Sequence, residues 1–460
     1  MAELPPGPTA PPLAQQLAWI AAPTRLLTHC ARRFGATFTL RTATQPPTII
    51  VTEPAAIREI FTGDPEVFRA GDAARILEPV LGSGSVLLLD GARHARERKL
   101  LLPPFHGERL RAHAAVMQET ARRILAGWPL GRPAPIHTAM QRITLEVILR
   151  SVFGFRPGPD MDAMCALLSR WANRGSSLFG TALLFLLPTT PGSSPLRRAL
   201  GLVSMREAPA SGLDTTRVLP WRRLVDDNRA VEAALREQIA RRRAAPAGDD
   251  VLSLLLAARD EDGRGLSEDD LRDELLTMLV AGHETTATAL TWAIHHLLDH
   301  PDALARARAE AAASDDPLAE RPWIEAVTRE TLRLTPVVPM TARYLARPAR
   351  IGGRDLPAGV VVAPCIWLTH RRADLWPAPE RFDPARFLGV KADPYAYLPF
   401  GGGARRCLGM GFAALEMRVV LAEVLRRLQL QRAPGAPPRP MRRGVTLAPS
   451  GGVTVIATLQ

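Results

Sequence analysis

A single cysteine follows a glycine-rich loop near the C-terminal end of this 460-residue chain. Residues 400–409 read Phe-Gly-Gly-Gly-Ala-Arg-Arg-Cys-Leu-Gly, and an apolar helical pattern follows from Leu408. Glycines let a backbone approach a flat macrocycle, where a Cβ atom would collide. The start of a helix stabilises negative charge on the sulfur of Cys407, and Arg405 can bind a carboxylate. These residue types favour a thiolate ligand to a haem iron, with Arg405 on a haem propionate.

Two other interpretations fit a glycine-rich loop that carries a cysteine. The cysteine could be a buried structural residue, and the loop alone leaves this open. Triple glycine also suggests a phosphate-binding loop. That alternative is excluded, because no Gly-Lys-Ser/Thr or Gly-x-Gly-x-x-Gly ending follows a strand here.

The cysteine loop resembles the haem-ligand signature of the cytochrome P450 family. The resemblance rests on these positions: Phe400, Gly403, Arg405, Cys407 and Gly409. Together with the motifs below, which follow the family order, it spans roughly residues 13–460. It implies a mainly α fold with a minor β lobe, the cytochrome P450 fold. It also implies haem b between two central helices, with Cys407 as the ligand of the iron.

A long helical pattern carries a second group of polar residues. It begins after an N-cap at Ser267 and runs to Asp299, roughly 45–50 Å at 1.5 Å per residue. Its middle reads Ala281-Gly-His-Glu-Thr-Thr, and a glycine inside a helix costs about 1 kcal/mol relative to alanine. A residue choice that is unfavourable for the local helix indicates a functional site. The segment resembles the family's oxygen-binding motif, in which Ala281 would contact the haem and Glu284 and Thr285 would relay protons to dioxygen. A threonine-rich kink with a solvated glutamate is the alternative.

An acid and an arginine share one face of the predicted helix Trp323–Leu334. Glu330 and Arg333 are three positions apart, a spacing that usually gives only a weak surface ion pair. Together with Arg381 they resemble the family's buried Glu–Arg–Arg triad, which locks this helix to the segment before the cysteine loop. The triad would serve folding and haem retention, and loss of one member would leave an uncompensated charge.

Further basic residues match the propionate-binding positions of the family. His94 and Arg98 are four positions apart on a predicted helix, and Arg343 lies near a predicted strand. Each alone would be read as a solvated charge. With Arg405 they supply donors for two carboxylates that would otherwise be buried unpaired. Three neighbouring basic residues on the same predicted helix would face outward and dock the electron donor: Arg93, Arg96 and Lys99.

The other histidines and cysteines predict no metal site. His283 is interpreted as a packing or hydrogen-bonding residue. His295 and His296 are adjacent, so their side chains point about 100° apart on a helix and cannot readily chelate one ion. The four cysteines are far apart and show no Cys-x-x-Cys pairing, which argues against zinc sites and disulfides.

Helical periodicity dominates the chain, and no long linker interrupts it. We therefore expect a proline-rich tail over residues 1–12 and one domain over residues 13–460. The other elements expected from periodicity are a helix over 13–34, a hairpin of Thr37–Leu40 with Thr48–Thr52, strands near Thr341–Leu345 and Gly359–Ala363, and a closing hairpin of Val445–Leu447 with Val453–Thr458.

A segment rich in Pro, Gly and Ser separates two helical stretches. It covers Pro191–Leu219 and follows the apolar run Leu178–Leu187. In a haem oxygenase this region would form a mobile lid over the substrate channel. A surface insertion without a role fits the part from 191 to 211 equally well.

Composition and charge bear on partners and compartment. The chain carries 58 basic and 46 acidic residues, a net charge of +12, which favours an acidic partner. No nucleic-acid-binding module appears, so a small acidic electron carrier suits a haem enzyme better than nucleic acid. The N-terminus lacks a signal peptide, and no apolar run approaches the roughly 20 residues of a membrane span. We therefore expect a soluble, monomeric, cytoplasmic protein.

The resemblance implies a monooxygenase that inserts one oxygen atom from dioxygen into a C–H bond. Electrons would come indirectly from NAD(P)H through a separate ferredoxin or flavodoxin and its reductase. A peroxide-driven or isomerase-type haem-thiolate enzyme is the first alternative, and a non-catalytic haem-binding protein is the second. The residues expected to line the pocket are nearly all aliphatic, with no buried charge to anchor a polar group. They therefore favour a fatty acid, terpenoid or steroid-like substrate. These residues are Ile76, Val86, Phe185, Val280, Val337, Val338 and Leu447.

Overall fold

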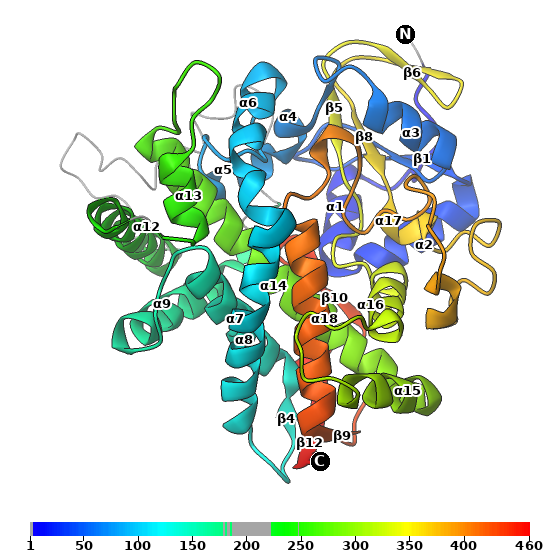
Figure 1. Ribbon diagram of the computed structural model, residues 1–460. Coiled ribbons are helices and arrows are strands. Elements are labelled where there is room, and N and C mark those ends of the chain that lie inside the picture. Colours follow the sequence, from blue (N-terminus) through cyan, green and yellow to red (C-terminus); the bar gives the residue numbers. More distant parts are fainter. Residues whose placement is uncertain (1–2, 178–179, 182–184, 186–221, 247) are drawn as a thin grey trace.

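The computed structural model describes residues 3–177, 180–181, 185, 222–246 and 248–460. Figure 1 shows a lobe that contains most strands and the N-terminal helices beside a larger group of long helices. The segment 191–219 and most of 178–187, for which a lid was expected, lie outside the described residues. The helices are α1 (Pro12–Ala21), α2 (Pro23–Phe34), α3 (Pro54–Thr62), α4 (Ala70–Ala74), α5 (Glu78–Leu81), α6 (Gly91–Leu101), α7 (Gly107–Ala126), α8 (Ile136–Ser151), α9 (Pro159–Gly175), α12 (Arg222–Ala244), α13 (Val251–Ala257), α14 (Glu268–Asp299), α15 (Pro301–Ala312), α16 (Pro322–Leu334), α17 (Ile366–Thr369) and α18 (Met410–Arg427).

The strands form small sheets, and the largest has the order β1-β2-β8-β5-β3. In that sheet β2 and β8 are parallel, whereas the other neighbours are antiparallel. The remaining pairings are β4 and β9 on either side of β12, β10 with β11, and β6 with β7. The strands are β1 (Thr37–Leu40), β2 (Thr48–Val51), β3 (Phe68–Arg69), β4 (Ala134–Pro135), β5 (Arg343–Leu345), β6 (Ala349–Ile351), β7 (Arg354–Leu356), β8 (Val361–Pro364), β9 (Leu428–Arg432), β10 (Pro440–Arg443), β11 (Thr446–Pro449) and β12 (Thr454–Leu459).

Helix α14 runs through the middle of the molecule, as its long helical pattern predicts (Figure 1). The Ser267 hydroxyl accepts a hydrogen bond from the backbone N–H of Asp270 at 3.1 Å, which caps the first turn. Three acidic residues in that turn complement the helix dipole. A Cβ atom on Gly282 would lie 2.7 Å from Cδ1 of Ile148. The glycine of the motif therefore lets α8 pack closely against α14.

Two expectations at the chain ends need correction. The helix expected over 13–34 is divided into α1 and α2, because Pro23 begins a new helix and cannot donate a backbone hydrogen bond. The prediction of a closing hairpin is wrong, because β11 pairs with β10 whereas β12 pairs with β9 and β4. The turn at 450–452 separates them, and its glycines Gly451 and Gly452 have φ of 70° and 68°. The predicted hairpin of β1 with β2 is confirmed.

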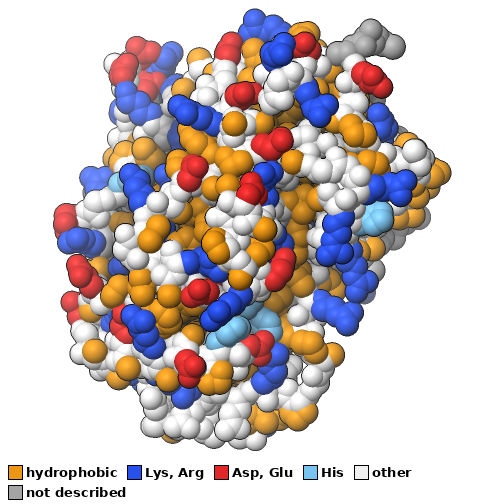
Figure 2. Space-filling model, turned by 90° about the vertical axis from the view of Figure 1, so that its right-hand side faces the viewer, with side chains coloured by type: hydrophobic (Ala, Val, Ile, Leu, Met, Phe, Trp, Pro, Cys, Tyr) orange, Lys and Arg blue, Asp and Glu red, His pale blue; other side chains and the backbone are white. Residues whose placement is uncertain are grey.

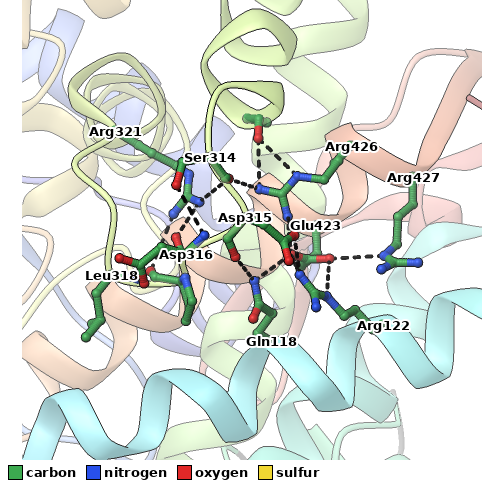
Figure 3. Close-up of polar contacts among 12 residues, drawn as sticks. Gln118, Arg122, Ser314, Asp315, Asp316, Leu318, Arg321, Glu423, Arg426 and Arg427 are labelled. Carbon is green, nitrogen blue, oxygen red and sulfur yellow. Dashed lines mark hydrogen bonds and ion pairs between the residues drawn. The ribbon is translucent and has the colours of Figure 1, made fainter.

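A buried carboxylate on α18 ties three elements together (Figure 3). Glu423 is 1% exposed and accepts hydrogen bonds from Gln118 Nε2 at 3.0 Å and from Arg122 Nε at 3.1 Å, both on α7. Arg426 and Arg427, one turn further along α18, also donate to it. Arg426 also donates a hydrogen bond, at 3.0 Å, to Asp315 in the loop after α15. The cluster therefore joins α7, α18 and that loop.

We expect Glu423→Gln to lower the free energy of unfolding by about 2–3 kcal/mol at pH 7, because charge-assisted hydrogen bonds to a buried carboxylate are lost. Burial alone would raise the pKa of Glu423, but hydrogen bonds from Arg122, Arg427 and Gln118 lower it below its usual value. A depressed pKa stabilises the fold above the unfolded-state value, about 4.3, and this stabilisation disappears as the pH falls through the folded-state pKa. Urea unfolding at pH 7 and pH 3.5 should therefore show a difference between wild type and variant that shrinks in acid. Glu119→Gln is the matched control, because Glu119 is 60% exposed in its ion pair with Arg150. This substitution should change the free energy of unfolding by less than about 1 kcal/mol. An equal loss in both variants would contradict the argument.

The molecular surface mixes charges of both signs. On the face shown in Figure 2, basic side chains are interspersed with acidic and apolar ones. Among the described residues, no helix combines the length and apolar character that crossing a membrane requires.

Candidate active site

The cysteine loop is packed against α3. The backbone N–H of Cys407 donates to the carbonyl of Phe400 at 3.0 Å, which closes the loop. Gly403 has φ of 63°, and a Cβ atom there would lie 2.1 Å from the carbonyl oxygen of Phe61. A Cβ atom on Gly402 would lie 2.3 Å from the Phe61 ring. Two of the three glycines are therefore required by contact with α3, and not only by approach to a cofactor as the sequence suggests.

The Cys407 side chain remains accessible, whereas Cys30, Cys165 and Cys365 are buried. Helix α18 begins at Met410, so the cysteine precedes the first turn and does not belong to it. Burial by the surrounding protein raises the pKa of the Cys407 thiol, opposed by the Gly409 N–H and by the charges of Arg98 and Arg406.

The structure brings together the four groups expected to bind propionates. His94 on α6 is 6% exposed, and its pKa falls to about 4 because of burial and the charges of Arg405, Arg98 and Arg343. Burial, together with the charge of Arg405, lowers the pKa of Arg343 to about 10. Such an accumulation of like charge is unfavourable unless anions compensate it. Asp90 is the carboxylate that pairs with Arg405, at 2.6 Å.

Arg405 and Arg98 also have protein acceptors. Arg405 donates to the carbonyl oxygens of Val86 at 3.1 Å and Leu89 at 2.5 Å. Arg98 Nη2 donates to the carbonyl of Arg406 at 2.6 Å. These bonds fix the guanidinium groups but use only part of their donors. The cluster therefore fits a group with two carboxylates near Cys407, as haem has.

The oxygen-motif residues lie on the same long helix and face different surroundings. Ala281 is exposed although it lies in the middle of α14. The Thr285 hydroxyl donates to the Ala281 carbonyl at 2.5 Å, one turn earlier. Glu284 points between α14, α8 and β10: Gln141 Nε2 donates to Oε2 at 2.7 Å, and Arg443 Nε lies 3.1 Å from Oε1.

Glu284 is held as a carboxylate. Burial would raise its pKa, but three nearby groups together lower the pKa to about 2: His137, whose Nε2 lies 3.5 Å from Oε1, Arg443 and His283. His137 and Gln141 are four positions apart on one face of α8, and that spacing was a signal the sequence interpretation missed. Arg443 could be identified only from the fold. His283 hydrogen-bonds the Leu279 carbonyl through Nδ1, consistent with its interpretation as a packing residue.

The buried Glu–Arg cluster exists, but its third side chain is Arg386 and not Arg381. Arg333 binds Glu330 through Nε–Oε2 at 2.7 Å and Nη2–Oε1 at 2.9 Å, and Arg386 Nε donates to Oε1 at 3.1 Å. The prediction for Arg381 is wrong, because its side chain is exposed and only its carbonyl accepts from Arg333, at 3.1 Å. Arg386 is brought in by a short helix that Asp383 caps.

The three candidate docking residues are all engaged in ion pairs within the chain. Arg93 pairs with Glu97 at 3.0 Å and Asp270 at 2.7 Å. The other two bind the loop before α14: Arg96 pairs with Asp260 at 2.5 Å, and Lys99 pairs with Glu261. These side chains therefore fasten α6 to α14 and to the loop that precedes it.

The predicted pocket residues fall into two neighbouring groups. Val86, Val337 and, partly buried, Val280 belong to the main core, whereas Leu447 and Phe185 belong to a cluster with Trp19. The N–H of Leu447 donates to the Val337 carbonyl at 2.8 Å, which joins the two groups. Ile76 and Val338 are half-buried. Within the described residues no cluster of His, Cys, Asp or Glu is arranged to hold a metal ion.

Comparison with known proteins decides the family. The family model for cytochrome P450 matches residues 5–191 and 220–455. The chain belongs to the cytochrome P450 family. "Putative cytochrome P450 135B1" of Mycobacterium tuberculosis is 40% identical over 457 residues, 98% of this chain and 91% of the relative. "Putative cytochrome P450 138" of the same species is 36% identical over 98% of this chain and 96% of the relative.

Solved cytochrome P450 structures share the fold. Retinoic acid-bound cyanobacterial CYP120A1 matches with a TM-score of 0.81 at 24% identity, over 100% of both chains. The cytochrome P450DA heme domain matches with a TM-score of 0.81 at 23% identity, over 100% of this chain and 98% of the other. The predicted fold is confirmed. As a cytochrome P450, the protein is a haem-dependent monooxygenase, an oxidoreductase that uses dioxygen.

Proposed function

We propose that Cys407 is the thiolate ligand of haem b and that the protein hydroxylates a C–H bond of a lipophilic substrate. The observation that carries the proposal is the position of an accessible cysteine beside the cluster of His94, Arg98, Arg343 and Arg405, of which His94 and Arg343 are buried. These four residues would hold the two propionates, and Ala281 would face the porphyrin. Bound haem supplies the oxygen activation, because a thiolate ligand favours O–O cleavage.

The polar residues in the middle of α14 would deliver protons to the reaction. The Thr285 hydroxyl, which donates to the Ala281 carbonyl at 2.5 Å, would relay protons at its oxygen, and the Glu284 carboxylate would accept protons from solvent and pass them on. Because its pKa is about 2, Glu284 stays ionised throughout the neutral range and acts as an acceptor, not as a stored acid. His137, Gln141 and Arg443 would position this carboxylate.

The electrons would come from NAD(P)H through a separate acidic ferredoxin or flavodoxin and its reductase. The net charge of +12 favours encounter with an acidic carrier. Arg93, Arg96 and Lys99 are paired within the chain, so Arg406, exposed next to Cys407, is a better candidate for docking.

Carbon monoxide difference spectroscopy of the reduced protein tests the ligand. We expect the Soret maximum at the long-wavelength position of a thiolate-ligated haem; a maximum at the position of a histidine-ligated haem would refute the proposal. Turnover with ferredoxin and reductase, compared with peroxide alone, separates the monooxygenase from the peroxide-driven alternative.

Thr285→Ala should lower product formed per electron pair by roughly tenfold or more, while NAD(P)H consumption continues, because proton delivery to oxygen is lost. The ratio of product and hydrogen peroxide to NAD(P)H measures this coupling. Thr285→Ser should retain most of it. Thr286→Ala is the matched control, since both hydroxyls donate to the carbonyl four residues earlier but Thr286 is buried whereas Thr285 is half-buried. Unchanged coupling in Thr285→Ala would count against the relay.

A further inference from the structure

The guanidinium group of Arg442 on β10 lies between two aromatic rings. Its Cζ atom is 4.4 Å from the ring centroid of Trp19 and 4.7 Å from that of Phe185. Stacking uses the two faces of the planar group and leaves its N–H donors pointing outward in the plane. The rings therefore orient the guanidinium without satisfying its hydrogen bonds.

One edge of this guanidinium is shielded from water and lacks an acceptor. Nε and Nη2 of Arg442 are both buried, and neither has a hydrogen-bond partner within the described part of the chain. Burial lowers the pKa of Arg442 to about 10, so the group remains a cation at neutral pH. A buried charged donor without an acceptor is strongly unfavourable, and native proteins rarely keep one.

The unsatisfied edge has the geometry that binds a carboxylate. Nε and Nη2 are the two donors that form paired, parallel hydrogen bonds to the two oxygens of a carboxylate. The same protein shows this with Arg333, whose Nε and Nη2 bind the two oxygens of Glu330 at 2.7 and 2.9 Å. Arg442 presents the same pair of atoms with no Glu or Asp opposite them within the described residues.

The surroundings of Arg442 are apolar and connect to the oxygen motif. Its partner across the β10–β11 ladder is Leu447, which packs in one cluster with Trp19 and Phe185. The Phe185 carbonyl accepts hydrogen bonds from Gln16 at 2.5 Å and Thr44 at 2.9 Å, which hold this ring in place. The following residue, Arg443, reaches the Glu284 carboxylate at 3.1 Å. Two consecutive residues of β10 therefore contact the aromatic pair and the acid beside Thr285, from opposite faces of the strand.

We propose that Arg442 binds the carboxylate of a lipophilic acid, whose hydrocarbon part extends over the aliphatic residues toward Thr285. The inference rests on the proposed function, because it assigns the substrate class of the same site. It corrects the expectation that no buried charge would anchor a polar group. Among fatty acids, terpenoids and steroids, it selects members that carry a carboxylate.

A purely structural role for Arg442, as a clamp between Trp19 and Phe185, makes the opposite prediction. A clamp would not distinguish an acid from its methyl ester, because both have the same hydrocarbon chain. The comparison of the two ligands therefore separates recognition from packing.

The test is a spin-shift titration of the haem-loaded protein with saturated fatty acids of 12, 16 and 20 carbons and their methyl esters. Wild type should bind at least one acid about tenfold or more tightly than its ester at pH 7.5, as expected for a charge-assisted bidentate pair. Arg442→Gln should weaken the acid by about tenfold to a hundredfold and leave the ester within about twofold, which removes the preference. Arg442→Lys should keep part of the preference for the acid over its ester.

Arg306→Gln is the matched control, because Arg306 also stacks on a tryptophan, Trp323, at 3.9 Å but is exposed on α15. It should behave as wild type. Thermal unfolding of each variant shows whether the fold is intact. Equal affinity for acid and ester, a preference that survives in Arg442→Gln, or no binding of any of the acids overturns the inference. A missing thiolate signature in the carbon monoxide spectrum would refute the proposed function instead, so the two failures are distinguishable.

Discussion

Replacing Cys407 by serine is expected to abolish the thiolate signature and reduce monooxygenase turnover to background. A serine hydroxyl is a far weaker acid than a thiol, so it would not supply the anionic sulfur that favours O–O cleavage. Because Cys407 is exposed and serine has nearly the same size and shape as cysteine, the fold should survive the change. The carbon monoxide difference spectrum and the rate of product formation measure the two effects.

The matched control for this experiment is Cys30→Ala. Cys30 is fully buried in the cluster around Trp19, and burial raises the pKa of its thiol. This variant should lose some stability but keep the thiolate spectrum. If Cys407→Ser retained the long-wavelength Soret band, the ligand would have to be another residue.

Replacing Arg333 by alanine should lower the free energy of unfolding by about 3–5 kcal/mol, because it leaves the buried carboxylate of Glu330 without its bidentate partner. Both side chains are 0% exposed. Arg333 also donates to the carbonyls of His370 at 2.8 Å and Pro379 at 2.7 Å, so the segment before the cysteine loop loses two of its hydrogen bonds to α16. Urea unfolding measures the loss, and haem content after purification should fall with it.

The pair Arg386→Ala and Arg381→Ala tests the correction to the triad. Arg386 donates to Glu330 at 3.1 Å, so its loss should cost about 1.5–3 kcal/mol, the usual range for a hydrogen bond to a charged group. Loss of the exposed Arg381 side chain should lower the free energy of unfolding by less than about 0.5 kcal/mol. Equal destabilisation by the two variants would refute the assignment of Arg386.

Local signals account for what could be predicted. The N-cap at Ser267 and the apolar pattern after it specify α14 through interactions within one helix. The hairpin of β1 and β2 likewise depends on neighbouring segments. Cys407 was singled out by the glycine-rich loop and the arginines before it, and the Glu284–Thr285 pair by a residue choice that is unfavourable inside a helix; both are properties of the sequence itself.

Partners that are distant in sequence were predicted poorly. Pro379-Glu-Arg381 and Pro384-Ala-Arg386 both place an arginine after a proline, and nothing local shows which one reaches Glu330. Strand β12 pairs with β9 and β4 rather than with β11, and strand pairing of this kind depends on the whole topology. The requirement for Gly402 and Gly403 comes from Phe61, more than 300 residues earlier.

The sequence by itself determined the cysteine ligand motif, the oxygen motif and the long helix that carries it, because residue type and spacing express those features directly. Only the tertiary structure decided which charges meet. It fastened Arg93, Arg96 and Lys99 to acids of the same chain and surrounded Glu284 with His137, Gln141 and Arg443. It also left one edge of Arg442 without an acceptor among the residues that the structure describes. The physical reason is that the interaction between two charges depends on their separation and burial in space, which spacing along the chain does not express.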